Sequence, residues 1–136
     1  MGELVLVTGG SGYIAGWCVV ELLRRGYDVR TTVRVPGKAA AVTDAVATAV
    51  DPAGRLGYAV ADLTAADGWA EAVQGVDYVL HVASPLASAG STEPDALIRP
   101  ARGGALRVVM TSAANAASPS SYATEGVTDA TRTTRR

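Results

Sequence analysis

Three small residues lie at three-residue intervals near the N-terminus. Gly9, Gly12 and Ala15 fall in the segment TGGSGYIAG, residues 8–16. Such a pattern binds polyphosphates, because the first glycine permits a tight turn, the second lets phosphate approach the backbone, and the third small residue allows close packing. The amides at the start of a following helix attract negative charge. The spacing predicts a site for the diphosphate of a dinucleotide; the alternative is an ordinary glycine-rich turn.

Two cations follow about twenty residues after the glycines. A dinucleotide with a free ribose 2′-hydroxyl is usually held there by Asp or Glu, but this chain has TTVR at residues 31–34 and then Lys38. Arg34 and Lys38 suit a 2′-phosphate. The sequence therefore favours NADP over NAD, and the alternative is that both side chains are solvated surface charges.

A glycine pattern of this kind needs a strand before it and a helix after it. Residues 3–7 form a continuous apolar run, which is typical of a strand buried on both faces. Apolar residues recur at intervals of three and four over residues 12–25 and stop before Gly26, which predicts a helix. Residues 28–34 are rich in β-branched side chains and predict a second strand. The three elements make a complete βαβ unit.

The rest of the chain continues the alternation of helix and strand. We expect a helix at 38–50, a strand at 56–61, a short helix at 69–73, and strands at 77–82 and 107–111. Residues 100–110 leave room for about two helical turns, interrupted by Gly103 and Gly104. The pattern predicts an α/β fold, a Rossmann-type doubly wound parallel sheet of about five strands.

The bulk composition excludes several classes of partner. A formal net charge of -1 offers no field for nucleic acid or an anionic membrane, and no apolar run is long enough to cross a bilayer. The single Cys18 excludes an internal disulfide and a multi-cysteine metal site. His81 has no companion ligands, so we expect no metal, and we expect it to pack or to donate or accept a hydrogen bond beside the cofactor. Without a basic leader, a cytoplasmic location is expected.

Four motifs in order resemble the extended short-chain dehydrogenase/reductases, in particular the dihydroflavonol reductase-like branch of the NAD-dependent epimerase/dehydratase superfamily. They are VTGGSGYIAGW at 7–17, ELLRRGYDVRTTVR at 21–34, AVADLT at 59–64 and HVASP at 81–85. The resemblance implies that Asp62 and the next residue border the adenine and that the HVASP segment follows the ribose and nicotinamide. The expected cofactor-binding residues are Gly9, Gly12, Tyr13, Ile14, Arg34, Lys38, Asp62, Leu63, Val82, Ala83 and Ser84.

The resemblance also implies NADPH-dependent reduction of a carbonyl in a ketone, aldehyde or flavonoid-like substrate. In the family a Ser after the fifth strand orients the carbonyl, a Tyr donates a proton, and a Lys four residues later lowers the Tyr pKa. Ser112 is the candidate serine. Tyr122 is the only later tyrosine, but Gly126 stands four residues beyond it, and Lys38 is the only lysine. The Tyr-x-x-x-Lys pair is therefore missing.

The sequence is consistent with two hypotheses about function. The chain is either a shortened reductase that uses Ser112 with Tyr122 as an improvised acid, or a non-catalytic NADP-binding module or truncated remnant. We expect residues 1–112 to form the front part of the nucleotide-binding domain, residues 113–136 to be a loosely packed tail, and the relatives' C-terminal substrate domain to be missing. A deletion around 106–108 would explain the short helix before the fifth predicted strand.

Overall fold

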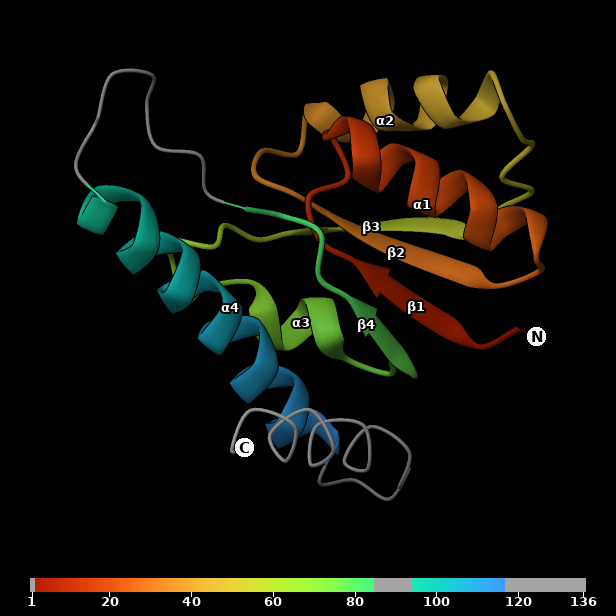
Figure 1. Ribbon diagram of the computed structural model, residues 1–136. Helices are drawn as coiled ribbons and strands as arrows, with labels where there is room; N and C mark the ends of the chain where they lie inside the picture. The colour runs from red at the N-terminus through yellow and green to blue at the C-terminus, as the bar shows by residue number, and fades with distance from the viewer. Residues whose placement is uncertain (1, 85–93, 117–136) are drawn as a thin grey trace, which may run out of the picture.

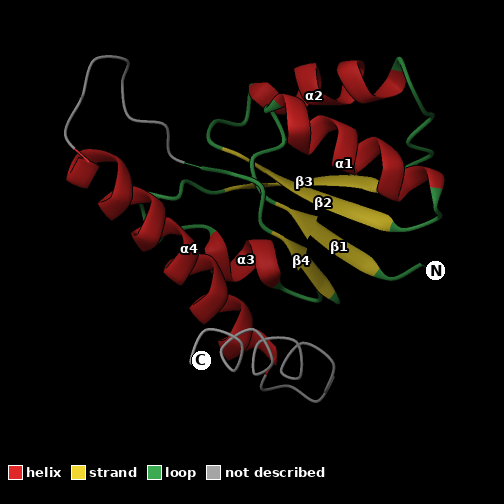
Figure 2. Cartoon of the chain, in the orientation of Figure 1, coloured by secondary structure: helices red, strands yellow, loops and turns green. Residues whose placement is uncertain are grey.

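The computed structural model describes residues 2–84 and 94–116, and its centre is a parallel sheet with the strand order β3-β2-β1-β4. The strands are β1 (Leu4–Val7), β2 (Asp28–Val33), β3 (Leu56–Val60) and β4 (Tyr78–Leu80). Helices α1 (Tyr13–Arg24) and α2 (Lys38–Ala47) cover one face, and α3 (Trp69–Val73) and α4 (Pro94–Ala116) cover the other (Figures 1 and 2). The predicted Rossmann-type doubly wound fold is confirmed.

Strand β1 is apolar throughout because both of its faces are covered. Val5 and Val7 belong to the core under α1 and α2, whereas Leu6 belongs to the core under α3 and α4. Successive side chains of a strand point to opposite faces, so a central strand with helices on both sides has no exposed position for polar residues. The continuous apolar run at the N-terminus is the sequence signature of this arrangement.

All three strand pairings are parallel, so the carboxyl ends of the strands meet at one edge of the sheet. The glycine turn follows β1, Arg34 follows β2, Asp62 follows β3 and His81 follows β4. Ligands of open parallel sheets bind at this edge, beside the point where the order of the strands reverses. Here the chain starts in β1, crosses to β2 and β3, and returns to β4 on the other side of β1.

The side chain of Arg30 ties the sheet to α3. It extends from β2, and its guanidinium donates to the carbonyl oxygens of Ala72 and Gln74, at 2.9 and 2.7 Å, and to that of Glu71 at 3.3 Å. The last carbonyls of a helix have no partner within the helix. Arg30 therefore caps this five-residue helix and fixes it against the sheet.

The prediction of a fifth strand at residues 107–111 is wrong. These residues lie within α4, which is 23 residues long, so the helix predicted to be short is continuous, and the described sheet has four strands rather than about five. Val108 is buried in the same core cluster as Trp69 and Leu63, and Gly104, one turn earlier, lies directly against Leu63. A short apolar run does not distinguish strand from helix, and this packing overrides the low helix propensity of the glycines.

The boundary expected after residue 112 falls inside α4, which continues to Ala116. Residues 117–136, including Tyr122, lie outside the described part of the chain. Among the residues that the structure describes, no helix combines the length and apolar character needed to span a membrane.

Candidate dinucleotide site

The glycine turn is tight and is anchored to β2. Gly9 has φ +78°, in the left-handed region, and its carbonyl accepts from the Gly12 amide at 2.9 Å. Its own amide donates to the Thr32 hydroxyl at 2.9 Å, and the Gly10 amide donates to the Thr32 carbonyl at 2.9 Å. The turn predicted at Gly9 is present, and its backbone is held in one conformation by the neighbouring strand.

The start of α1 is open toward this edge of the sheet. Gly12 is the N-cap and makes no side-chain capping hydrogen bond, and within 4 Å a Cβ placed on it would meet only the carbonyl oxygen of Gly9, at 3.2 Å. The first amides of a helix lack partners within the helix. Tyr13 and Ile14 are exposed, 83% and 66% respectively. The geometry fits the diphosphate predicted from the glycine spacing.

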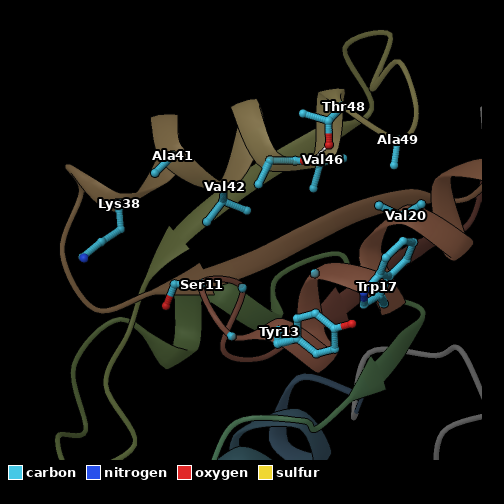
Figure 3. A pocket seen from close by; sticks show the side chains of 14 residues that line it. Ser11, Tyr13, Trp17, Val20, Lys38, Ala41, Val42, Val46, Thr48 and Ala49 are labelled. Atoms are coloured by element: carbon cyan, nitrogen blue, oxygen red, sulfur yellow. Dashed lines mark hydrogen bonds between the residues drawn. The ribbon is translucent and has the colours of Figure 1, made fainter.

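A cavity of about 530 Å³ connects the turn with α2. Gly10, Ser11 and Gly12 line it together with Lys38, the first residue of α2 (Figure 3). From there it continues between the two helices past apolar side chains, including Trp17, Val42 and Val46. The cavity thus brings one of the two predicted cations to the glycine turn, and Arg34 does not line it.

Arg34 lies instead near Asp62, which follows β3. The Asp62 carboxylate accepts from the Thr64 amide at 2.8 Å and from the Thr64 hydroxyl at 2.7 Å. These hydrogen bonds lower the pKa of Asp62, and the charges of Arg34 and Arg107 lower it further. The side chain of Asp62 is therefore ionised, is held in a fixed orientation by Thr64, and lies near the positive charges of Arg34 and Arg107.

Leu63, the second residue predicted beside the adenine, is not available to a ligand through its side chain. It is only 8% exposed and lies in the core beneath α4. Arg107 of α4 donates a hydrogen bond to its carbonyl oxygen. Of this predicted pair, only Asp62 presents side-chain atoms at the surface.

The segment after β4 is attached to the end of β1 through Thr8. The buried Thr8 hydroxyl oxygen accepts from the amides of Val82 and Ala83, both at 3.0 Å, and lies 2.8 Å from Nδ1 of His81. A Cβ on Gly9 would come within 2.8 Å of the Ala83 Cβ, so this segment touches the glycine turn. The hydrogen bond expected of His81 is confirmed, and burial lowers its pKa.

Thr8 itself was missed by the sequence reasoning. The position of Thr8 could have predicted its role, because its hydroxyl lies directly between a buried strand and the first glycine of the turn. A polar side chain that is buried there needs a hydrogen-bond partner. Ser84, the last predicted residue of this segment, is exposed at the same edge.

The catalytic candidates are not brought to this edge. Ser112 lies in α4, where its hydroxyl donates to the Val108 carbonyl at 2.7 Å, and α4 packs against α3 on the sheet face opposite to α1 (Figure 1). Tyr122 lies outside the described residues. The sole lysine, Lys38, lines the cavity at the glycine turn. Candidate binding groups thus lie at the ends of four strands. The described residues do not place a serine, a tyrosine and a lysine together at this edge.

A family model described as NAD dependent epimerase/dehydratase matches residues 5–127. The chain belongs to this family. Dihydroflavonol 4-reductase of Arabidopsis thaliana is 36% identical over 107 residues, which cover 79% of this chain and 28% of that protein. Cinnamoyl-CoA reductase 2 of the same plant is 38% identical, over 79% of this chain and 31% of the relative. The resemblance to dihydroflavonol reductase-like proteins is confirmed.

Solved structures agree with this assignment to the epimerase/dehydratase family. Gre2 of Candida albicans in complex with NADPH superposes with a TM-score of 0.67 at 26% identity, over 80% of this chain and 32% of Gre2. Vestitone reductase from alfalfa superposes with a TM-score of 0.57 at 25% identity, over 86% and 33% of the two chains. The present chain spans about a third of the length of these relatives.

Proposed function

We propose that the chain binds NADP(H) at the carboxyl edge of its sheet, with the diphosphate at the glycine turn. The observation that carries the proposal is the open N-terminus of α1, which shares one cavity with Lys38. Backbone amides and a helix N-terminus bind phosphate groups without further side chains. The binding groups would be the residues at Gly9, Gly12, Tyr13 and Ile14, with Asp62 on the adenine side and Val82, Ala83 and Ser84 along the ribose and nicotinamide.

The preference for NADP rests on the charges around the 2′ position. The end of β2 carries Arg34, where a carboxylate would hold a free 2′-hydroxyl, and Lys38 lines the cavity beside Ser11. The carboxylate of Asp62 is already engaged by Thr64. The complex of Gre2 with NADPH supports the same choice of cofactor in a relative.

The activity we propose is NADPH-dependent reduction of a carbonyl group in a ketone, aldehyde or flavonoid-like compound. The relatives named dihydroflavonol 4-reductase, cinnamoyl-CoA reductase 2 and vestitone reductase support the reaction class. In this view the chain provides the cofactor-binding part. Hydride would come from the nicotinamide, next to the segment from Val82 to Ser84.

A second candidate is a module that binds NADP(H) without catalysis. It is favoured by the position of Ser112, whose hydroxyl donates a hydrogen bond to a carbonyl within α4. It is also favoured by the position of Lys38, the only lysine, which lines the cavity at the glycine turn and not the proposed nicotinamide end of the site. A reductase of this type needs a serine, a tyrosine and a lysine around one carbonyl. The described residues do not place such a set together.

Calorimetric titration with NADPH and NADH tests the binding proposal. We expect NADPH to bind at least about tenfold more tightly, since a hydrogen bond to a charged group contributes roughly 1.5–3 kcal/mol. Arg34→Ala should weaken NADPH binding and leave NADH binding unchanged, and Lys38→Ala should weaken the binding of NADPH more than that of NADH. Arg25→Ala is the matched control, because Arg25 lies at the other end of α1 and pairs with Glu21. Equal affinities for the two cofactors would overturn the assignment to NADP.

Turnover separates the two candidates. NADPH oxidation is followed at saturating cofactor with a panel of ketones, aldehydes and flavanones. Turnover that is lost in Tyr122→Phe supports the shortened reductase. Tight NADPH binding with no oxidation of cofactor by any carbonyl of the panel supports the non-catalytic module.

A further inference from the structure

The hydrogen bonds of Thr8 fix the protonation state of His81. A hydroxyl has one proton to donate and two lone pairs to accept with. Both lone pairs of the Thr8 oxygen are used by the amides of Val82 and Ala83, which can only donate. The hydroxyl proton must therefore go to Nδ1 of His81, 2.8 Å away. Thr8 is fully buried, so no water molecule can accept the hydroxyl proton in place of Nδ1 of His81.

An imidazole nitrogen that accepts a hydrogen bond carries no proton. His81 is thus neutral and holds its single proton on Nε2. A protonated ring has N–H groups at both positions, and its Nδ1–H would point at the Thr8 oxygen, whose lone pairs are taken. Burial is the only influence that lowers the pKa of His81, and no charged side chain of the described residues shifts it.

We propose that His81 is a positioning residue for the dinucleotide: its neutral ring accepts the Thr8 hydroxyl and keeps residues 81–83 against the glycine turn, and protonation of the ring weakens binding. The inference rests on the proposed function, because it concerns dinucleotide affinity. It goes beyond that function by assigning a pH-sensitive role to a side chain outside the proposed diphosphate-binding groups.

The contact between Ala83 and Gly9 transmits the effect. The two residues are so close that a Cβ on Gly9 would lie 2.8 Å from the Ala83 Cβ and 3.1 Å from its Cα. A shift of the segment that carries Val82 and Ala83 therefore acts directly on the glycine turn that leads into the proposed diphosphate site at the start of α1. Thr8 directly precedes Gly9, and its hydroxyl oxygen accepts from the Ala83 amide. The orientation of this hydroxyl depends on His81 as its acceptor.

The test is the pH dependence of NADP⁺ affinity, measured by calorimetry between pH about 8 and about 5, across the ordinary His pKa of about 6.5. The oxidised cofactor is used because it survives acid. The matched variant is His81→Asn, whose side-chain oxygen takes the place of Nδ1, accepts the Thr8 hydroxyl and does not titrate. Since the 2′-phosphate also titrates near about pH 6, only the difference between the two proteins is interpreted.

We expect the wild-type affinity to fall by about fivefold more than that of His81→Asn over this range, the loss that one hydrogen bond produces. His81→Leu, which has no acceptor, should bind weakly at every pH. Parallel pH profiles in wild type and His81→Asn would overturn the inference. So would wild-type binding that strengthens in acid relative to the variant, because this would mean that a charged ring attracts the phosphates directly.

A ligand-free measurement keeps the inference separate from the proposed function. The ¹⁵N chemical shifts of the His81 ring report which nitrogen carries the proton. An unprotonated Nδ1 at neutral pH is expected, and a protonated Nδ1 would refute the assignment whether or not a cofactor binds. Absence of NADP⁺ binding at every pH, with the expected tautomer, would instead refute the proposed function and the role of His81 in binding.

Discussion

Replacement of Gly9 by alanine adds one methyl group where the structure has no room for it. At φ +78° an L-residue is strained, which costs roughly 1–2 kcal/mol. The new Cβ would lie 2.8 Å from the Cβ of Ala83, and overpacking of this kind costs roughly 1–3 kcal/mol. Together the two effects predict a loss of about 2–5 kcal/mol in the free energy of unfolding.

Urea denaturation followed by circular dichroism measures this loss. The control is Gly16→Ala in the interior of α1, where an added Cβ meets nothing within 4 Å. Because glycine is a poor helix former, this control should be more stable than the parent by about 0.5–1 kcal/mol. The same methyl group is thus predicted to have opposite effects at two positions seven residues apart.

A double variant separates the two causes. Combining Gly9→Ala with Ala83→Gly removes the 2.8 Å contact with the Ala83 Cβ but leaves the backbone strain and the 3.1 Å approach to the Cα of residue 83, so only part of the steric loss, which is roughly 1–3 kcal/mol, should be recovered. If Gly9→Ala unfolds at the same urea concentration as Gly16→Ala, the described turn is wrong. If the double variant recovers nothing, Ala83 does not lie against Gly9.

Three further outcomes are expected. Arg30→Met should lower the free energy of unfolding by about 1.5 kcal/mol in urea titrations, because the last carbonyls of α3 lose a charged donor. Thr8→Val should lower it by about 1–3 kcal/mol in the same assay, since two backbone amides lose their acceptor. The pKa of Asp62 is below its ordinary 3.8, so its contribution to stability is present above pH 3.8 and is lost as the pH falls through the lower folded value. In Asp62→Asn the acid part of a plot of melting temperature against pH should therefore be flatter; an unchanged slope would contradict the assignment.

Most elements were predictable because their patterns are local. The helix expected at 12–25 is Tyr13–Arg24, and the short helix at 69–73 is Trp69–Val73. The strand expected at 28–34 is Asp28–Val33. Strand ends depend on hydrogen bonds to neighbours, so the strand expected at 77–82 shrinks to Tyr78–Leu80. Beyond its end, the Val82 amide donates to the side chain of Thr8 instead of to a strand.

The glycine turn and its cations were predicted as a set of types and spacings, and the structure supplied their contacts. Lys38 is brought to the turn because α2 packs beside α1, which no local pattern specifies. The close approach of Ala83 to Gly9 joins residues more than seventy positions apart, through the pairing of β4 with β1. The role of Leu63 as a buried residue under α4 depends in the same way on packing between distant elements.

The sequence by itself determined the fold class, the βαβ unit and the glycine turn for which we propose diphosphate binding, because hydrophobic periodicity and glycine spacing act within a few residues. Only the tertiary structure decided that residues 107–111 are helical, since Val108 is buried in one core cluster with Trp69 and Leu63 and a short apolar run suits either state. The tertiary structure alone showed that hydrogen bonds of the Thr8 hydroxyl connect His81, Val82 and Ala83 to the turn. Such bonds depend on which strand lies beside β1, and that is settled by packing across the whole sheet.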